Sequence, residues 1–134
     1  MLNKTLLAET NILDQADAKI VSQTALKVFF NITKGWQLNA HEEMALLGEP
    51  ARSTFFKWRK NEGPTISKDT LERISYIMGI YKALRLLFPN EAQSNAWPKK
   101  ANQYFGGESA LDFMLKGSVT HLSDVRRYLD SVRG

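Results

Sequence analysis

Apolar residues recur along most of this chain at steps of three and four, the spacing of one face of an α-helix. The pattern predicts a first helix from Asp14 to Gly35 and a second helix from Asn39 to Leu47. Apolar and polar residues do not alternate over any stretch long enough to predict a β-strand. We therefore expect an all-α fold.

The second predicted helix carries clear signals at both of its ends. Asn39 is the expected N-cap, and Glu42 stands three residues later, as in a capping box. Residues 48–50 supply the turn that follows this helix. Because proline fixes φ near the helical value, Pro50 is expected in the first turn of the next helix.

A third helix is predicted over residues 50–60, where aromatic side chains are interleaved with cationic ones and no acidic residue occurs. Phe55 and Trp58, at i and i+3, are the expected core pair, and Phe56 is expected to be partly buried. The remaining positions of this helix then lie toward solvent or toward a partner.

A helix, a glycine-containing turn and a basic helix together form the pattern of a helix-turn-helix, whose second helix enters the major groove of DNA. Exposed cations neutralise phosphates and so supply the sequence-independent part of DNA affinity. The alternative is an ordinary solvated basic face, with Arg59 packed against the preceding helix. The candidate DNA contacts are Arg52, Ser53, Thr54, Lys57, Arg59 and Lys60.

The most regular apolar stripe begins after Ser67, which is the expected N-cap of a fourth helix, and it ends before Pro89. Gly79 interrupts the stripe at a cost of about 1 kcal/mol relative to alanine, which indicates close helix packing or a bend. The predicted buried stripe is Leu71, Ile74, Met78, Tyr81, Leu84 and Phe88.

After Pro89 the pattern changes to three short helices, predicted over 91–97, 109–116 and 122–132. Gly106-Gly107 is expected to form a tight turn behind a buried Phe105, because glycine adopts positive φ at no steric cost. The expected apolar faces of the last two helices are Leu111, Met114 and Leu115, then Leu122, Val125, Leu129 and Val132.

A length of 134 residues suits one domain or two very small ones that share a core. We divide the chain into a flexible N-terminal arm (1–13), a helix-turn-helix half (14–88) and a helical C-terminal domain (89–134). No apolar run approaches the ~20 residues that would cross a bilayer, so no membrane partner is expected and the cytoplasm is the expected location.

The composition excludes several kinds of catalytic or metal site. With 0 Cys the chain has no disulfide framework, no thiolate metal site and no Cys nucleophile. His41 and His121 lack a second ligand at metal spacing, and Ser118, His121 and Asp124 lack a nucleophile-elbow context. Ser118 and Ser123 are instead expected to cap the last helix, with His121 at the surface. We expect no enzyme activity, no cofactor and no metal.

The C-terminal third carries a specific sequence signature. Residues 105–117 read FGGESALDFMLKG, and residues 125–130 read VRRYLD. Together with the helix-turn-helix pattern, these residues resemble the Xre/MbcA/ParS antitoxin family, in which an Xre-like domain precedes a small toxin-binding domain. The resemblance implies the antitoxin of a type II toxin–antitoxin system. Such an antitoxin covers the active-site entrance of a RES-domain toxin that consumes NAD, and the complex represses its own operon.

The resemblance also directs attention to the surface that would meet the toxin. It implies that the loop of Gly106, Gly107 and Ser109 lies near the interface. Tyr and Arg are favoured interface anchors, so we add Arg126, Arg127, Tyr128 and Arg133 to the candidate toxin contacts. The alternative for these arginines is favourable placement near a helix C-terminus.

Two other functions remain open at this stage. The chain fits a free-standing helix-turn-helix repressor whose tail only dimerises, and it also fits an interaction module that has lost DNA binding. Repressors of this type read two half-sites about one DNA turn apart, so a homodimer or a larger toxin–antitoxin assembly is expected. The expected partners are therefore operator DNA, a RES-domain toxin and a second copy of the chain.

Overall fold

The computed structural model describes the backbone of residues 4–134 and the side chains of residues 14–134. Over this range the only strand-like feature is a single antiparallel bridge between Ala101 and Ser109, so the predicted all-α class is confirmed. The elements are α1 (Lys4–Gly35), α2 (Ala40–Leu46), α3 (Arg52–Arg59), α4 (Lys68–Leu87), α5 (Glu91–Ala96), the 3-10 turns η1 (Trp97–Lys99) and η2 (Gln103–Phe105), α6 (Ala110–Met114) and α7 (Val119–Arg133).

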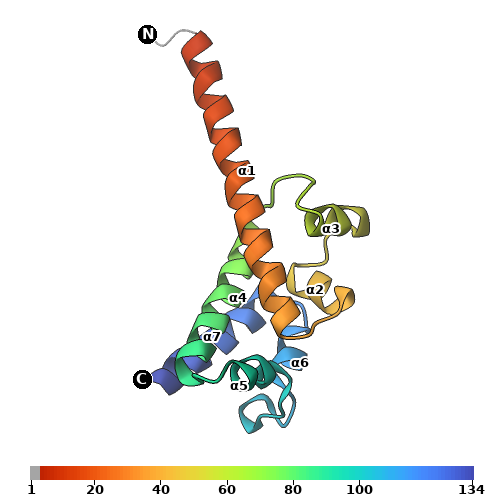
Figure 1. Cartoon of the computed structure of the whole chain (residues 1–134), viewed down its shortest axis with the longest axis vertical. Helices are drawn as coiled ribbons and strands as arrows, with labels where there is room; N and C mark the ends of the chain where they lie inside the picture. Colours follow the sequence, from red (N-terminus) through yellow and green to blue (C-terminus); the bar gives the residue numbers. More distant parts are fainter. Residues whose placement is uncertain (1–3) are drawn as a thin grey trace.

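The first helix is longer than its sequence pattern predicted. It begins at Lys4 rather than Asp14 and extends away from the rest of the protein (Figure 1). The prediction was wrong because we started the helix at its first aspartates, although no Gly or Pro interrupts residues 4–34. Residues 1–3 lie outside the described part of the chain, and the flexibility expected for residues 1–13 stays a prediction.

The second helix follows its sequence signals. The side-chain oxygen of Asn39 accepts the N–H of Glu42 at 2.8 Å, and a Glu42 carboxylate oxygen accepts the N–H of Asn39 at 2.9 Å. The predicted capping box is confirmed. The turn contains two residues with positive φ, Gly48 and Glu49. Pro50 lies before the N-cap of α3 rather than in its first turn, contrary to prediction. Pro50 and the N-cap residue Ala51 are both non-helical, and the helix begins only at Arg52.

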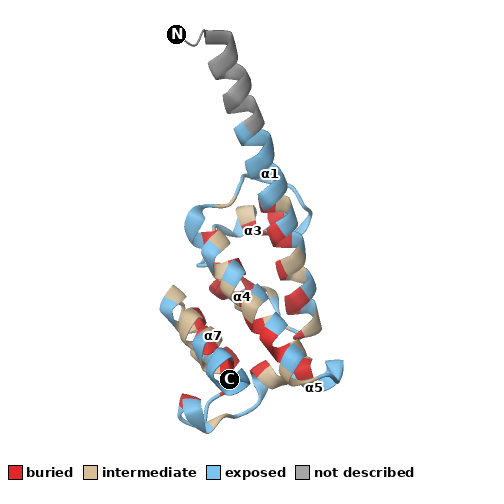
Figure 2. Cartoon of the chain, turned by 90° about the vertical axis from the view of Figure 1, so that its left-hand side faces the viewer, coloured by how far each residue is buried: buried red, intermediate tan, exposed pale blue. Residues whose placement is uncertain are grey.

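Helix α4 is the central element, since α1 packs on one side of it and α7 on another (Figure 2). Of the predicted stripe only Ile74 and Leu84 are fully buried, and Met78 is 40% exposed. The prediction assumed one buried face, but two neighbours bury a wider set of α4 residues. That set is Thr70, Ile74, Ile77, Ile80, Ala83 and Leu84.

Gly79 marks the close approach of α7 to α4. A Cβ added to Gly79 would lie 1.4 Å from the Nη1 atom of Arg126 in α7, so the predicted close packing is confirmed. The C-terminal helices therefore build on the same α4 that packs against α1. The arrangement leaves one continuous core rather than two separate ones.

Helices α6 and α7 are firmly capped, and α7 begins at Val119, three residues before the predicted start at 122. Ser109 caps α6 and Ser118 caps α7, whereas Ser123 lies inside α7 and does not cap it. His121 is half-buried, and its Nδ1 accepts the N–H of Ser118 at 3.2 Å, so it completes a capping box. Val132 is 53% exposed, contrary to prediction, because α7 runs past the end of its packing surface.

The glycine pair behaves as its sequence predicted. Gly106 and Gly107 have φ values of 71° and 90° and form the tight turn after Phe105. Phe105 is buried. A residue with a Cβ is strained at such φ values, which explains why two glycines occur together here.

Candidate functional site

Helix α3 is held to the body by one face. Phe55 is fully buried and Trp58 nearly so, as predicted. The indole Nε1 of Trp58 also donates to the backbone oxygen of Pro64 at 2.9 Å, which fixes the loop that follows the helix. Because both anchors lie on the inner face, the opposite face of α3 is directed outward.

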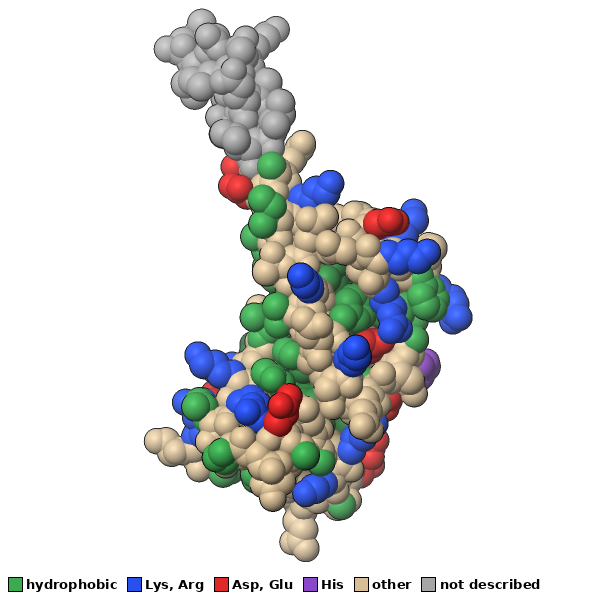
Figure 3. Space-filling view, viewed as in Figure 1, with side chains coloured by type: hydrophobic (Ala, Val, Ile, Leu, Met, Phe, Trp, Pro, Cys, Tyr) green, Lys and Arg blue, Asp and Glu red, His purple; other side chains and the backbone are tan. Residues whose placement is uncertain are grey.

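The outward face carries most of the predicted DNA contacts. Arg52, Ser53, Lys57 and Lys60 are exposed, and Thr54 is half-buried. Lys and Arg side chains gather on the side of the molecule that carries α3 (Figure 3). The Arg52 guanidinium lies 5.1 Å from the ring centroid of Phe56, which is itself 38% exposed. In the part of the chain with described side chains, none of these cations forms an ion pair.

Arg59 differs from the other cations of α3. Its Nη1 lies 3.2 Å from a carboxylate oxygen of Glu43 in α2, and its guanidinium lies over the rings of Phe30 and Phe55. Glu43 is buried, and the hydroxyl of Thr33 donates to its second carboxylate oxygen. The geometry favours the alternative interpretation, in which Arg59 fixes α3 against α2.

The backbone of α3 adds to this positive surface. The N-cap residue, Ala51, provides no capping side chain. The first N–H groups of the helix therefore remain available to an anion, and the helix dipole favours negative charge at that end. Unpaired cations beside a helix N-terminus suit the phosphates of double-stranded DNA.

The C-terminal region presents a different surface, an aromatic cluster. The ring of Tyr128 in α7 stacks on Tyr104 at a centroid distance of 4.2 Å and meets the edge of Phe105 at 5.6 Å. Tyr104 is 63% exposed, so the cluster has an accessible outer end. Its members are Trp97, Tyr104, Phe105, Phe113 and Tyr128.

The aromatic cluster lies beside part of the predicted toxin-binding set. Gly106 and Gly107 are exposed and follow Tyr104 and Phe105 directly. Ser109 is buried, and its hydroxyl accepts the N–H of Asp112 at 3.0 Å, so its side chain supports α6. Sequence reasoning missed Tyr104, although an aromatic residue two positions before a glycine pair was the available signal.

Arg126 lies apart from this cluster. Its Nε donates to both carboxylate oxygens of Asp130, at 3.1 and 3.0 Å, and its guanidinium fills the space beside Gly79 of α4. Arg133 lies 3.9 Å from the same aspartate, whereas Arg127 is exposed. The structure therefore divides the predicted toxin contacts between two flanks of α7.

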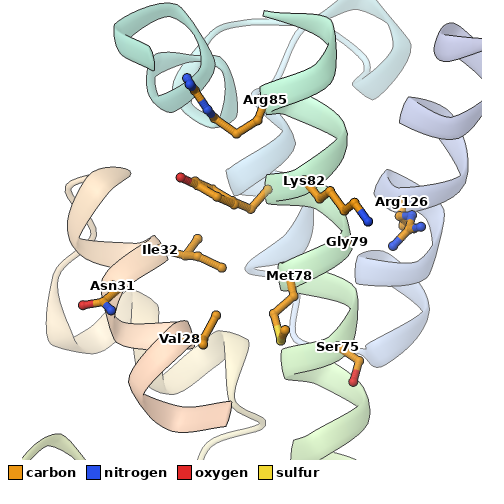
Figure 4. A pocket seen from close by; sticks show the side chains of 10 residues that line it. Val28, Asn31, Ile32, Ser75, Met78, Gly79, Lys82, Arg85 and Arg126 are labelled. Carbon is orange, nitrogen blue, oxygen red and sulfur yellow. The ribbon is translucent and has the colours of Figure 1, made fainter. Parts of the chain in front are cut away.

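Arg126 lines a groove between α1 and α4 (Figure 4). The groove has a volume of about 660 Å³. Except for Arg126, it contains no residue that the sequence marked as a site. Its apolar and cationic lining residues include Val28, Ile32, Met78, Lys82, Arg85 and Arg126.

The described side chains do not assemble a metal site, since no three of their His, Asp or Glu groups are placed to hold an ion. His41 is exposed on α2, far from the capping box of His121 in the chain. No helix within the described range is both long and apolar enough to cross a lipid bilayer.

Comparison with known proteins finds two family models that match successive parts of the chain. Residues 15–79 match the family model for the antitoxin Xre-like helix-turn-helix domain. Residues 83–134 match the family model for the antitoxin Xre/MbcA/ParS C-terminal toxin-binding domain. The chain is also similar to the "Uncharacterized protein y4oB" of Sinorhizobium fredii (strain NBRC 101917 / NGR234). The two are 50% identical over 109 residues, which cover 81% of this chain and 84% of the relative.

Proposed function

The chain belongs to the Xre/MbcA/ParS antitoxin family, and on this basis we propose that it neutralises a RES-domain toxin that consumes NAD and represses its own operon. The observation that carries the proposal is the match of residues 83–134 to the toxin-binding domain, a region that contains the aromatic cluster with Tyr104 at its exposed end. The antitoxin itself performs no chemistry. It acts by covering the entrance to the toxin's active site.

The aromatic cluster supports the toxin-binding half of the proposal. Tyr104 and Tyr128 form a stacked pair with one exposed end, and Gly106 and Gly107 leave open space around the adjoining turn. Rigid aromatic side chains bury large areas at small entropic cost, and such residues dominate the affinity of protein interfaces. The turn permits a close backbone approach by the toxin, because glycine has no side chain to obstruct it.

The exposed face of α3 supports the repression half of the proposal. Lys57 and Lys60 have no carboxylate partner among the described side chains, so they are ready to meet phosphates. Arg52 lies near the N-terminus of the same helix. A helix-turn-helix dimer places two such helices about 34 Å apart, one turn of DNA. We therefore expect the operator to contain two half-sites.

A direct test uses the protein encoded by the gene next to the one that encodes this chain. We expect that protein to be toxic when it is expressed alone, to consume NAD when purified, and to lose this activity when the antitoxin is added in stoichiometric amount. A chain stopped at Phe88 is an unsuitable control, because α7 covers the buried residues of α4. The Tyr104→Ala variant is the better control, since Tyr104 is already exposed. Undiminished NAD consumption at saturating antitoxin contradicts the proposal.

The second candidate is a free-standing repressor, which is favoured by the cations of α3 because they need no toxin in order to bind DNA. The discriminating measurement is operator affinity with and without the toxin. An antitoxin forms a defined complex with the neighbouring protein. A free-standing repressor binds its operator tightly and forms no complex with that protein.

A further inference from the structure

The groove between α1 and α4 has an apolar part and a cationic part. In the apolar part, Val28 and Ile32 of α1 point toward α4, where Met78 lines the groove (Figure 4). Met78 is 40% exposed, so apolar surface remains in contact with water there. A ligand that covers this surface gains binding free energy roughly in proportion to the apolar area removed from water.

The cationic part of the groove lies beside Gly79. The Arg126 guanidinium of α7 occupies the space that a Cβ of Gly79 would fill. Lys82 lies three residues after Gly79, on the same face of α4. Its side chain extends toward Arg126 (Figure 4). Two cations from two different helices therefore approach each other at this side of the groove.

The positive charge of the groove is compensated only in part. The Nε atom of Arg126 donates to the carboxylate of Asp130, which does not line the groove. Lys82 forms no ion pair among the described side chains. The Nη1 atom of Arg85, which also lines the groove, is buried without a hydrogen-bond partner among the described residues. Because none of the lining residues is acidic, an anion in the groove would relieve the repulsion among these cations.

The size and the lining of the groove together define a class of ligand. Its volume of about 660 Å³ lies within the range of roughly 300–1,000 Å³ that is usual for small-molecule sites. An inorganic anion would satisfy the cations and leave the apolar part wet. A neutral hydrocarbon would cover the apolar part and leave the cations without a partner. A ligand that satisfies both parts has an anionic group joined to an apolar chain or ring.

We propose that this groove binds a small amphipathic acid. The carboxylate of the ligand lies between Lys82 and Arg126. Its apolar chain passes over Met78 toward Val28 and Ile32. The site uses neither the exposed face of α3 nor the aromatic cluster. It connects α1, in the part that matches the helix-turn-helix domain, with α7, in the part that matches the toxin-binding domain.

The test is nuclear magnetic resonance of the ¹⁵N-labelled full-length chain, titrated with decanoate below the concentration at which it forms micelles. Decanoate should bind saturably, and the amide signals that shift should belong to residues in and around the groove, with Gly79 among them. Decylammonium has the same apolar chain with a positive charge, and acetate has the same carboxylate without the chain. Each should bind at least tenfold more weakly than decanoate, because each satisfies only one part of the groove. Equal affinity for decanoate and decylammonium, equal affinity for decanoate and acetate, or shifts that leave the groove unaffected would overturn the proposal.

Two pairs of variants test the two parts of the groove separately. Lys82→Glu should weaken decanoate binding at least tenfold, because a like charge then faces the carboxylate. Lys100→Glu changes the net charge equally at an exposed position outside the groove, and it should bind decanoate like the wild type. Met78→Ala should weaken binding about threefold or more, whereas Leu86→Ala, at an exposed apolar position of α4 outside the groove, should not. Equal losses within either pair contradict the proposed site.

The amide spectrum without ligand provides the fold control for every variant. If Lys82→Glu alters that spectrum beyond its own neighbourhood, Lys82→Gln replaces it and should still bind decanoate about threefold more weakly than the wild type. Wild-type affinity in a correctly folded Lys82→Gln variant would then refute the carboxylate site. The titration contains neither toxin nor DNA, so its result is independent of the proposed antitoxin function.

Discussion

In α3, Lys57 and Lys60 extend into solvent without a carboxylate partner among the described side chains. In the C-terminal region, Arg126 lies 3.0 Å from Asp130 and Lys116 lies 3.9 Å from Glu108. A cation that is already paired has less to gain from a phosphate than an unpaired one. Both regions contain several Lys and Arg residues. The unpaired cations of α3 are suited to phosphates, whereas the paired cations Arg126 and Lys116 are less so.

The aromatic residues show the opposite distribution. Helix α3 buries Phe55 and Trp58 as anchors and leaves Phe56 only 38% exposed. The C-terminal region instead stacks Tyr128 on Tyr104 and leaves Tyr104 63% exposed. Aromatic rings at a surface favour a protein partner, whereas unpaired cations favour nucleic acid. Net charge alone would not separate the two surfaces, but the exposure of Tyr104 and the pairing of Arg126 and Lys116 do.

The largest expected effect comes from reversing charges on the exposed face of α3. Lys57→Glu with Lys60→Glu should lower affinity for the operator about 100-fold or more, because two phosphate contacts become repulsive. Fluorescence anisotropy measures this affinity at a fixed salt concentration, with DNA from the promoter of the gene that encodes the chain. The matched control is Lys100→Glu with Arg127→Glu, which changes the net charge equally at exposed C-terminal positions. An equal loss in the control would mean that net charge, not α3, determines binding.

The next largest effect is expected from removing the exposed ring of the aromatic cluster. Tyr104→Ala should weaken toxin binding about 30-fold, since an exposed anchor of this kind contributes about 2 kcal/mol at an interface. Operator affinity should stay unchanged. Isothermal titration calorimetry with the purified toxin measures the affinity, and Tyr104→Phe is the control because it keeps the ring and its stacking. Wild-type affinity in Tyr104→Ala would place the interface elsewhere.

A smaller effect concerns how α3 is held. Arg59→Ala should lower the free energy of unfolding by about 1–2 kcal/mol, because the buried Glu43 keeps only the Thr33 hydroxyl as a side-chain partner. Urea denaturation measures the change, and Lys57→Ala should stay within about 0.5 kcal/mol of the wild type as an exposed control. Adding Glu43→Gln to Arg59→Ala should recover part of the loss. Equal stability of Arg59→Ala and Lys57→Ala would show that the ion pair between Arg59 and Glu43 does not contribute to the free energy of unfolding.

The smallest effect sharpens the contact between the two regions. In an Arg126→Ala background, Gly79→Ala should stabilise the protein by about 1 kcal/mol, because alanine favours the helix. In the wild-type background the same change should stabilise less or destabilise, since the new Cβ displaces the Arg126 guanidinium. A double-mutant cycle of unfolding free energies gives the coupling. Strictly additive effects on the unfolding free energy would mean that the Arg126 side chain can move away from a new Cβ at position 79 without an energetic cost.

Local signals made much of the fold predictable. Asn39 and Glu42 form the expected capping box, Phe55 and Trp58 are buried, and the glycine pair forms the expected turn. Each of these features depends on residues that are close in sequence. The all-α class followed from the helical spacing of apolar residues along the whole chain.

Features that depend on neighbours in space were predicted less well. The buried face of α4 differs from its sequence stripe because α1 and α7 cover two sides of it, and no local pattern carries that information. The start of α1 was misplaced because Asp14 and Asp17 were taken as its first turn, although no Gly or Pro interrupts residues 4–34. Arg126 and Tyr128 are close in sequence, yet they face different flanks of α7, so a list of basic and aromatic residues combined two separate surfaces.

The separation of tasks between α3 and the aromatic cluster is tested by inhibition of the NAD consumption that we propose for the toxin. Three proteins are compared: the wild type, Lys57→Glu with Lys60→Glu, and Tyr104→Ala. If α3 and the aromatic cluster have separate tasks, the α3 variant inhibits at the same antitoxin concentration as the wild type. Tyr104→Ala then requires a concentration about 30-fold higher. An α3 variant that loses inhibition, or a Tyr104→Ala variant that inhibits like the wild type, contradicts the account.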